Sequence, residues 1–426
     1  MPRLLIVAYH FPPCMGSSGL LRSEKFASYL PEFGWDPVVL VPHPRAYESV
    51  DTKSAPTSLP KVIRAFALDS KKHLSIGKHY SSWSALPDRW IAWLFGAVPA
   101  GLRAIRKHKI DLIFSTFPIS TAILIGLILH RFTGLPWVVD LRDSMTEDDY
   151  PKDRRTRAVR RWIERQAVRR ASFVLFTAAS TRRMYLERYP ELDPNKAILV
   201  PNGYDEADFI GLNIALDPAT ARGKPLTLIH TGLIYPEERD PVPLFRALSR
   251  LKQEQQISAA DLRIVLRAAG CEEHFQRLID ELSIGDIVRL LPHVPYREAL
   301  QECANADGFL LLQAANCNHQ IPAKAYEYLR LRKPIFALTS RAGDTAALLE
   351  QVGGSTIADL ANEDDIYTRL PAFLASVRNG THPLPQPTEF RRFERKNQAR
   401  ELADCLSRAS RDKRVSNARA IEKAAG

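Results

Sequence analysis

The sequence has few cysteines, and they lie far apart. Its 426 residues contain five of them, Cys14, Cys271, Cys303, Cys317 and Cys405. The number is odd and no two cysteines form a C-x-x-C pair, which argues against a disulfide framework and a zinc site. Such usage is typical of a reducing compartment, so we expect a cytoplasmic protein.

Long hydrophobic runs are also missing. The longest, residues 90–102 and 119–129, fall short of the roughly 20 apolar residues that span a bilayer. Residues 4–8 form an apolar run of only a strand's length that Pro12 and Pro13 end, so no signal peptide is expected. We therefore expect a protein that is not integral to a membrane but can lie on one.

Acidic residues are outnumbered by basic ones. The chain has 48 Asp and Glu against 59 Lys and Arg, a formal net charge of +11, which favours anionic partners. We expect no nucleic-acid partner, because no zinc finger, helix-turn-helix or basic strand interleaved with aromatic residues occurs. No G-x-S-x-G, H-E-x-x-H or P-loop is present, and the histidines share no metal-ligand spacing. We therefore expect neither a hydrolase nor a metal site.

Short apolar runs alternate with helical patterns along most of the chain, which predicts an α/β fold with two Rossmann-like domains and parallel sheets. Predicted strands lie at 4–8, 38–41, 62–66, 112–115, 137–140, 173–177 and 198–200, and then at 226–230, 262–266, 288–291, 308–312 and 334–338. The predicted divisions are a first domain (1–210), a linker rich in Gly, Pro and charge (211–224), a second domain (225–388) and a basic helical tail (389–426).

Ligands of open α/β sheets bind beyond the carboxyl ends of the strands, so the loops there hold the candidate residues. In the first domain, Gly16 and Gly19 precede a helix and fit either a phosphate-binding turn or a tight strand–helix turn. Asp140, Arg142 and Asp143 close an apolar strand. They suit proton transfer or hydroxyl recognition, but equally a salt-bridge cluster.

The second domain offers a similar set. Gly232 and Arg239 follow its first strand and suit a diphosphate, and Arg267, which closes the next strand, is either a further cation or a surface residue. Lys324 and Glu327 share one face of the helix predicted in the segment IPAKAYEYLRLRKPIFAL, residues 321–338. They form either an ordinary surface pair or a site that holds a phosphate and a sugar hydroxyl together.

Arginine is concentrated in residues 153–170, with eight of the eighteen positions. Such runs are most often solvated helix faces. The run WIAWLFGAVPAGL, residues 90–102, is followed by the basic residues Arg103, Arg106, Lys107 and Lys109. Aromatic residues beside cations are typical of interfacial helices, so an anionic membrane surface is an expected partner.

The ordered segments YHFPPCMGSSGLLRSEKFASYLPEFGW, FSTFPIS, PWVVDLRD, VPNGYDEADF, HTGLIYPEERDP, HVPYREAL and IPAKAYEYLRLRKPI resemble the family 4 glycosyltransferases of the GT-B fold. The likeness is strongest to the bacterial subgroup that builds cell-surface polysaccharides and glycolipids. It implies two facing Rossmann-like domains, an active site in the cleft, and a C-terminal helix that crosses back to the first domain. It also implies a nucleotide-sugar donor (UDP- or GDP-linked) in the second domain and a lipid-linked or saccharide acceptor in the first. The expected transfer retains anomeric configuration and uses neither metal nor other cofactor.

By the same resemblance, Glu327 is the glutamate beside the donor ribose, and Arg239 takes the place of the diphosphate-binding lysine. Gly16 to Gly19 is the loop that contacts phosphate and acceptor, and Arg142 stands where the family has a histidine. His319 replaces a second family glutamate, and Leu233 replaces an arginine. One sugar-hydroxyl contact and one phosphate cation must therefore come from other residues, and Lys324 and Arg267 are the candidates.

The mechanism expected from these residues is stabilisation of the departing diphosphate by Arg239, Lys324 and the amides near Gly232 and Gly16. Asp140 or Asp143 would orient or deprotonate the acceptor hydroxyl. The alternatives are a GT-B nucleotide-sugar epimerase and a binding protein that has lost catalysis. Donor sugar, acceptor and linkage stay open.

Overall fold

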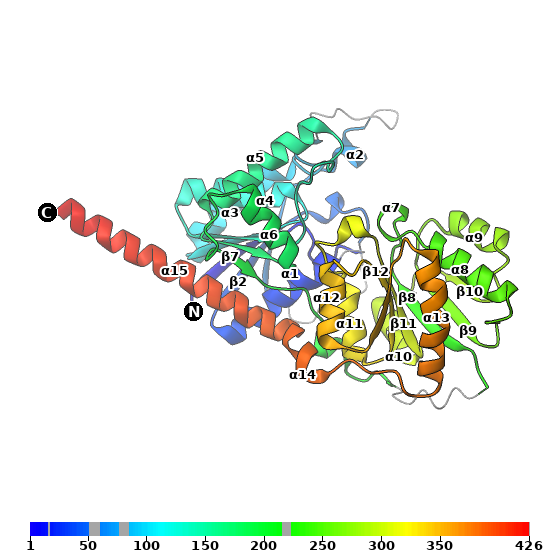
Figure 1. Ribbon diagram of the computed structural model, residues 1–426. Helices are drawn as coiled ribbons and strands as arrows, with labels where there is room; N and C mark the ends of the chain where they lie inside the picture. The colour runs from blue at the N-terminus through cyan, green and yellow to red at the C-terminus, as the bar shows by residue number, and fades with distance from the viewer. Residues whose placement is uncertain (16–17, 51–59, 76–84, 215–222, 426) are drawn as a thin grey trace. The chain divides into compact units, whose positions relative to one another are not determined.

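The computed structural model describes residues 1–15, 18–50, 60–75, 85–214 and 223–425 of the chain, including two parallel sheets (Figure 1). The chain divides into an N-terminal unit, Met1–Pro201 with Arg395–Gly426, and a C-terminal unit, Asn202–Glu394. Residues 202–210 therefore belong to the C-terminal unit rather than to the first domain, where the sequence analysis placed them. Positions 215–222 of the predicted linker lie outside the described residues.

The sheet of the N-terminal unit has seven parallel strands in the order β3-β2-β1-β4-β5-β6-β7. The order reverses between β1 and β4, and such a switch point is where open α/β sheets bind ligands. All seven strands were predicted from the sequence. They are β1 (Arg3–Val7), β2 (Asp36–Pro42), β3 (Lys61–Ala65), β4 (Leu112–Thr116), β5 (Trp137–Leu141), β6 (Phe173–Phe176) and β7 (Ala197–Leu199).

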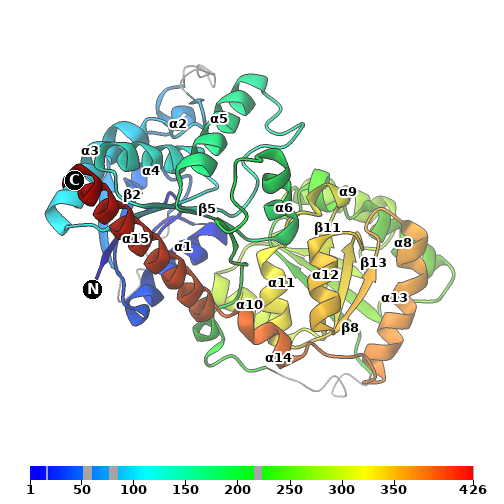
Figure 2. The same cartoon turned by 60° about the vertical axis from the view of Figure 1, so that its left-hand side comes forward.

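Helices cover both faces of this sheet, which explains why its central strands are apolar at nearly every position. One face packs against α3 (Trp93–His108), α4 (Ser120–Thr133), α5 (Arg154–Arg170) and α6 (Ala179–Arg188), and a short α2 (Ser70–His73) precedes them. The other face packs against α1 (Ser18–Tyr29) and the final helix α15 (Arg395–Ala425), which run side by side (Figure 2).

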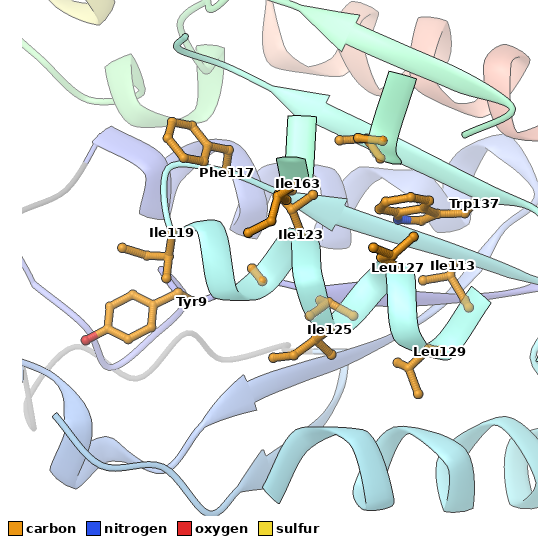
Figure 3. Close-up of a cluster of buried hydrophobic side chains, with 14 of the residues drawn as sticks. Tyr9, Ile113, Phe117, Ile119, Ile123, Ile125, Leu127, Leu129, Trp137 and Ile163 are labelled. Carbon is orange, nitrogen blue, oxygen red and sulfur yellow. The ribbon is translucent and has the colours of Figure 1, made fainter. Parts of the chain in front are cut away.

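Helix α4 is apolar around almost its whole circumference, because it is buried between the sheet and its helical neighbours. Figure 3 shows Leu127 of this helix beside Ile113 and Trp137 of the sheet, and Ile123 beside Ile163 of α5. Gly126 allows the close approach, since a Cβ atom there would lie 2.6 Å from Ser115 Oγ and 2.7 Å from Trp137 Nε1. This packing holds the strand ends β4 and β5 in place.

The C-terminal unit has a six-stranded parallel sheet in the order β10-β9-β8-β11-β12-β13, with its switch point between β8 and β11. Five strands match the predicted ones; β13 was missed because it is short and contains Ser and Thr. The strands are β8 (Leu226–Thr231), β9 (Leu262–Arg267), β10 (Val288–Leu291), β11 (Gly308–Gln313), β12 (Ile335–Thr339) and β13 (Ser355–Ala358).

Helices of the C-terminal unit also form two layers around its sheet. One face packs against α8 (Val242–Gln253), α9 (Glu272–Glu281) and α13 (Glu363–Arg378). The other packs against α10 (Tyr296–Asn305), α11 (Ala323–Leu331) and α12 (Asp344–Val352). The two short helices are α7 (Pro236–Arg239), which follows β8, and α14 (Pro387–Phe390).

The tail behaves differently at its two ends. Phe390 and Phe393, at the start of the tail, pack in the core of the C-terminal unit, where Phe393 contacts Tyr326. From Arg395 onward the chain belongs to the N-terminal unit. There Leu402 and Leu406 are fully buried beside Phe26 and other residues of α1, so the apolar stripe of α15 supplies the packing.

A buried ion pair joins α1 to the end of β5. Nε and Nη2 of Arg22 donate to the two carboxylate oxygens of Asp140 at 3.0 and 2.9 Å, and the two side chains are 1% and 0% exposed. Thr116 donates to the same carboxylate at 2.9 Å, and Arg22 also donates to the carbonyls of Val200 and Pro201. Removing one member of such a pair leaves the other charge buried and unpaired.

We predict that Arg22→Met lowers the free energy of unfolding of the N-terminal unit by roughly 3–5 kcal/mol, because Asp140 then loses its counter-charge. Urea unfolding followed by circular dichroism measures the loss. Lys396→Met is the matched control, since its 2.6 Å pair with Glu32 is about half exposed on each side and should cost less than about 1 kcal/mol. Equal losses in the two variants would contradict this role for Arg22.

Candidate functional site

In the N-terminal unit, the predicted site residues gather at the switch point of the sheet. Gly19 lies in the first turn of α1 against the guanidinium of Arg142, where a Cβ atom would be 2.3 Å from Nη1. Arg142 is 6% exposed, and its Nε has no hydrogen-bond partner in the described structure. Gly16, the other predicted glycine, lies outside the described residues. Glycine at position 19 therefore makes room for a cation beside the start of a helix.

The two aspartates of the predicted cluster have different surroundings. Asp140 is fully buried and bound by Arg22 and Thr116, which favours a structural role. Asp143 pairs with Arg142 at 3.9 Å, and 40% of its side chain is exposed. Of the two carboxylates, Asp143 is therefore the one that a hydroxyl group can reach.

His10 lies beside Arg142 in the same group of residues, although we expected no role for it from the sequence. Together with Ser23, Thr116 and Arg142 it lines a small hollow at the ends of β1 and β4. Burial and the positive charge of Arg142 lower the pKa of His10 to about 3, so its imidazole is neutral. It can share hydrogen bonds with a hydroxyl group but is a weak base. Its position directly after the first strand was the signal in the sequence.

In the C-terminal unit, the candidate residues surround the end of β8 at the second switch point. Gly232 follows this strand with φ of +96°, a conformation that suits glycine. Its amide donates to the Arg267 carbonyl at 2.8 Å and so belongs to the sheet. The N–H of Gly232 itself is therefore not available to a phosphate, contrary to our expectation. What Gly232 provides is space, since a Cβ atom there would lie 3.4 Å from Nζ of Lys324.

Lys324 lies in the first turn of α11, whose N-cap is Pro322, and its Nζ is 2.9 Å from Nε2 of His230. Arg239, in α7, lies close enough to help lower the pKa of Lys324, and Nη1 of Arg239 donates to the Leu233 carbonyl at 2.9 Å. Two cations therefore stand together at the end of β8, as a diphosphate-binding site requires.

Glu327, one turn further along α11, accepts a hydrogen bond from the hydroxyl of Tyr296 at 2.8 Å. Its negative charge also raises the pKa of Lys324. The shared helix face predicted for Lys324 and Glu327 is thus directed at one site. His319, in the place of the second family glutamate, is partly exposed just before α11, with Nε2 at 3.3 Å from Nε2 of Gln320.

Arg267 is not available as a phosphate cation. It is 8% exposed, its Nε donates to Glu302 at 2.8 Å and a second nitrogen pairs with the other oxygen of that carboxylate. Nη1 donates to the Pro292 carbonyl at 2.7 Å. These contacts tie β9 to α10, so the structural alternative holds for this residue.

In the described ranges, no group of three or more His, Cys, Asp or Glu side chains has the arrangement of a metal site. Independence from metals stays a prediction.

Residues 22–203 match the family described as a glycosyl transferase 4-like domain. No curated protein matches the chain in sequence.

Solved structures resemble it along nearly its whole length. Sucrose-phosphate synthase from Thermosynechococcus elongatus has a TM-score of 0.63 and 13% identity over 100% of both chains. Anabaena HepE in complex with UDP has a TM-score of 0.66 and 15% identity over 96% of this chain and 100% of the other. UDP-GlcNAc 2-epimerase from Methanocaldococcus jannaschii has a TM-score of 0.54 and 12% identity over 95% and 99%.

We predict that Glu302→Ala lowers the free energy of unfolding of the C-terminal unit by about 2 kcal/mol, because the buried guanidinium of Arg267 loses its charged partner. Thermal or urea unfolding measures this loss. Glu298→Ala on the same helix α10 is the control, since Glu298 is exposed and should change stability by less than about 0.5 kcal/mol. A stable Glu302→Ala protein would reopen Arg267 as a ligand residue.

The sheet orders and these similarities lead to one conclusion: the chain has the GT-B fold, and its residues 22–203 match a glycosyl transferase 4-like domain.

Proposed function

We propose that the protein is a retaining glycosyltransferase that moves a sugar from a UDP- or GDP-linked donor to a lipid-linked or saccharide acceptor. The observation that carries this proposal is the set of Arg239, Lys324 and Glu327 at the switch point of the C-terminal sheet. Two cations and a carboxylate match the diphosphate and ribose hydroxyls of a nucleotide-sugar. The UDP complexes of HepE, a protein of the same fold, support a nucleotide donor.

In the proposed reaction, negative charge grows on the departing diphosphate. Arg239 and Lys324 are already held at the end of β8, so they stabilise this charge without rearranging. Glu327 accepts hydrogen bonds from the ribose hydroxyls and thereby orients the donor. No metal is needed, because the two side-chain cations supply the positive charge.

The acceptor half-site is assigned to the N-terminal unit. Asp143 orients the acceptor hydroxyl or takes its proton, because it is exposed while Asp140 is sealed by Arg22. The neutral imidazole of His10 contributes a hydrogen bond to the acceptor. Arg142 adds positive charge beside the first turn of α1, which favours a phosphorylated acceptor there.

We predict that UDP- or GDP-sugars raise the melting temperature of the protein, and that Glu327→Ala and Arg239→Ala each weaken nucleotide binding about tenfold or more by removing a charged hydrogen-bond partner. Differential scanning fluorimetry at increasing nucleotide concentrations measures the stabilisation and the binding. A radiolabelled assay with polyprenyl-linked acceptors measures the transfer. Glu350→Ala on α12 is the control, since its pair with Arg341 is more than half exposed. If transfer is intact in Glu327→Ala, this site is wrongly assigned.

The surface of α3 favours an anionic membrane as the partner that presents a lipid-linked acceptor. Phe95, Pro99, Arg103 and Arg106 are exposed at intervals of three or four residues, so they form one stripe along the helix. The helix contains no acidic residue. No helix in the described parts of the chain is long and apolar enough to cross a bilayer.

A second aromatic residue extends this stripe. Phe66 lies against Gly96 of α3, where a Cβ atom would be 2.2 Å from the Phe66 carbonyl oxygen. The ring of Phe66 is 47% exposed and has the Arg45 guanidinium 4.8 Å from its centre. Exposed aromatic rings beside cations suit the headgroup region of a bilayer. We assign peripheral binding at a cytoplasmic membrane face to this surface.

We predict that the wild-type protein sediments with vesicles containing phosphatidylserine and not with neutral vesicles, and that Arg103→Glu weakens the binding roughly fivefold or more, since each cation contributes about 1 kcal/mol. Phe95→Asp should weaken it further by removing the apolar anchor. Ile210→Glu, which changes an exposed apolar residue of the C-terminal unit, is the control. Equal binding to both kinds of vesicle would contradict the docking surface.

The similarity to UDP-GlcNAc 2-epimerase favours one other candidate, a nucleotide-sugar epimerase of the same fold. Incubation of the donor without an acceptor separates the two. An isomerised free nucleotide-sugar would identify an epimerase, whereas transfer only in the presence of an acceptor identifies a glycosyltransferase. Tight nucleotide binding without turnover on any acceptor would indicate a protein that has lost catalysis.

A further inference from the structure

His230 makes a contact that the proposed reaction does not itself require. It is fully buried at the end of β8, with Nδ1 at 3.0 Å from the Leu310 carbonyl oxygen and Nε2 at 2.9 Å from Nζ of Lys324. A carbonyl oxygen only accepts hydrogen bonds, so Nδ1 carries the proton of the neutral ring. Nε2 is then a bare acceptor, and Lys324 donates to it.

Lys324 has little negative charge around it. The titratable and charged groups that face it are His230 of β8, Arg239 of α7, Cys303 of α10 and Glu327 of α11. Glu327 is the one carboxylate among these four, and it already accepts a hydrogen bond from Tyr296. In the part of the chain that the structure describes, Lys324 forms no ion pair.

Lys324 changes charge near neutral pH. Burial and the charge of Arg239 lower the pKa of Lys324 to about 7, although Glu327 and Cys303 oppose the shift. Burial and the charge of Lys324 lower the pKa of His230 well below its ordinary value, so its ring stays neutral. Burial raises the pKa of the Cys303 thiol to about 12.

We propose that His230 is a positioning residue that directs Nζ of Lys324 at the phosphate site, and that binding of a nucleoside diphosphate beside Lys324 is coupled to the uptake of one proton by its amine. The inference rests on the proposed function of this site. In the step, the free amine at Nζ accepts one proton from solvent or buffer and becomes an ammonium ion, which then pairs with a phosphate oxygen. The neutral acceptor His230 keeps Nζ directed at Gly232 in both states.

The direction of the pH effect follows from this linkage. A bound diphosphate raises the pKa of Lys324, so the complex holds more protons than the free protein above pH 7. Nucleotide affinity should therefore fall as pH rises, by roughly fivefold from pH 7 to 8 and by at most about tenfold for each further unit. The terminal phosphate of a nucleoside diphosphate loses its last proton at about pH 6. A rise in pH above 7 therefore only increases the negative charge of the ligand, so its own titration does not produce the fall.

Calorimetry of UDP and GDP binding to the full chain at pH 8, in two buffers of different ionisation enthalpy, measures the proton uptake directly. We expect uptake of about 0.8 proton for each nucleotide bound. Lys324→Arg keeps the positive charge but cannot titrate, so it should bind the nucleotide with no uptake and with little dependence on pH. Lys252→Arg changes an exposed lysine paired with Asp286 and should take up protons as the wild type does.

Variants of His230 test whether its Nε2 acceptor positions Lys324 for nucleotide binding. His230→Gln keeps an acceptor near the position of Nε2 and should bind UDP within about threefold of the wild type at pH 7. His230→Leu removes the acceptor, which lowers the share of ammonium and frees the lysine side chain, and should bind about tenfold more weakly. Melting temperatures show whether each variant is folded, and the wild-type and Lys324→Arg data decide the proton linkage even if both His230 variants unfold.

The outcomes distinguish this inference from the proposed function. Binding of UDP or GDP with no proton uptake by the wild type would overturn the inference and leave the donor site standing. Failure of both nucleotides to bind would contradict the donor site itself, and the inference with it. Uptake that persists in Lys324→Arg would assign the proton to another group.

Discussion

Everything proposed for the C-terminal unit depends on one partly buried contact, in which Lys324 donates to the imidazole of His230 and not to a carboxylate. A lysine neutralised by an acid would have little attraction left for phosphate. The neutral partner instead fixes the position of Nζ beside Gly232, and Arg239 keeps the local potential positive. On this account, both basic side chains are in position before a ligand arrives, and the proton that completes the charge of Lys324 enters with the diphosphate.

The N-terminal unit separates stability from chemistry in two neighbouring acids. Asp140 neutralises Arg22 in the core, and this pair joins α1 to β5 and to the residues after β7. Asp143, three residues later, is partly exposed beside Arg142, where we propose that the acceptor binds. Asp140 therefore stabilises the fold, whereas Asp143 is accessible to a ligand.

Strand positions and sheet class were predictable from the sequence because the strands are short apolar runs. Lys324 and Glu327 were likewise predictable from helical spacing. The ion pairs of Arg267 with Glu302 and of Asp140 with Arg22 were not predictable. In the sequence, a charged residue at a strand end looks the same whether it faces a ligand or forms an ion pair. The contact of His230 with Lys324 joins residues 94 positions apart, which no local pattern reveals.

A crystal structure of the protein with UDP, or with GDP if that nucleotide binds, tests the central claim most directly. We predict that the diphosphate lies at the end of β8 within hydrogen-bond distance of Nζ of Lys324 and the guanidinium of Arg239, with Nζ still in contact with His230. The ribose hydroxyls should reach Glu327. A diphosphate bound elsewhere in the C-terminal unit, with Lys324 facing only His230, would contradict the claim.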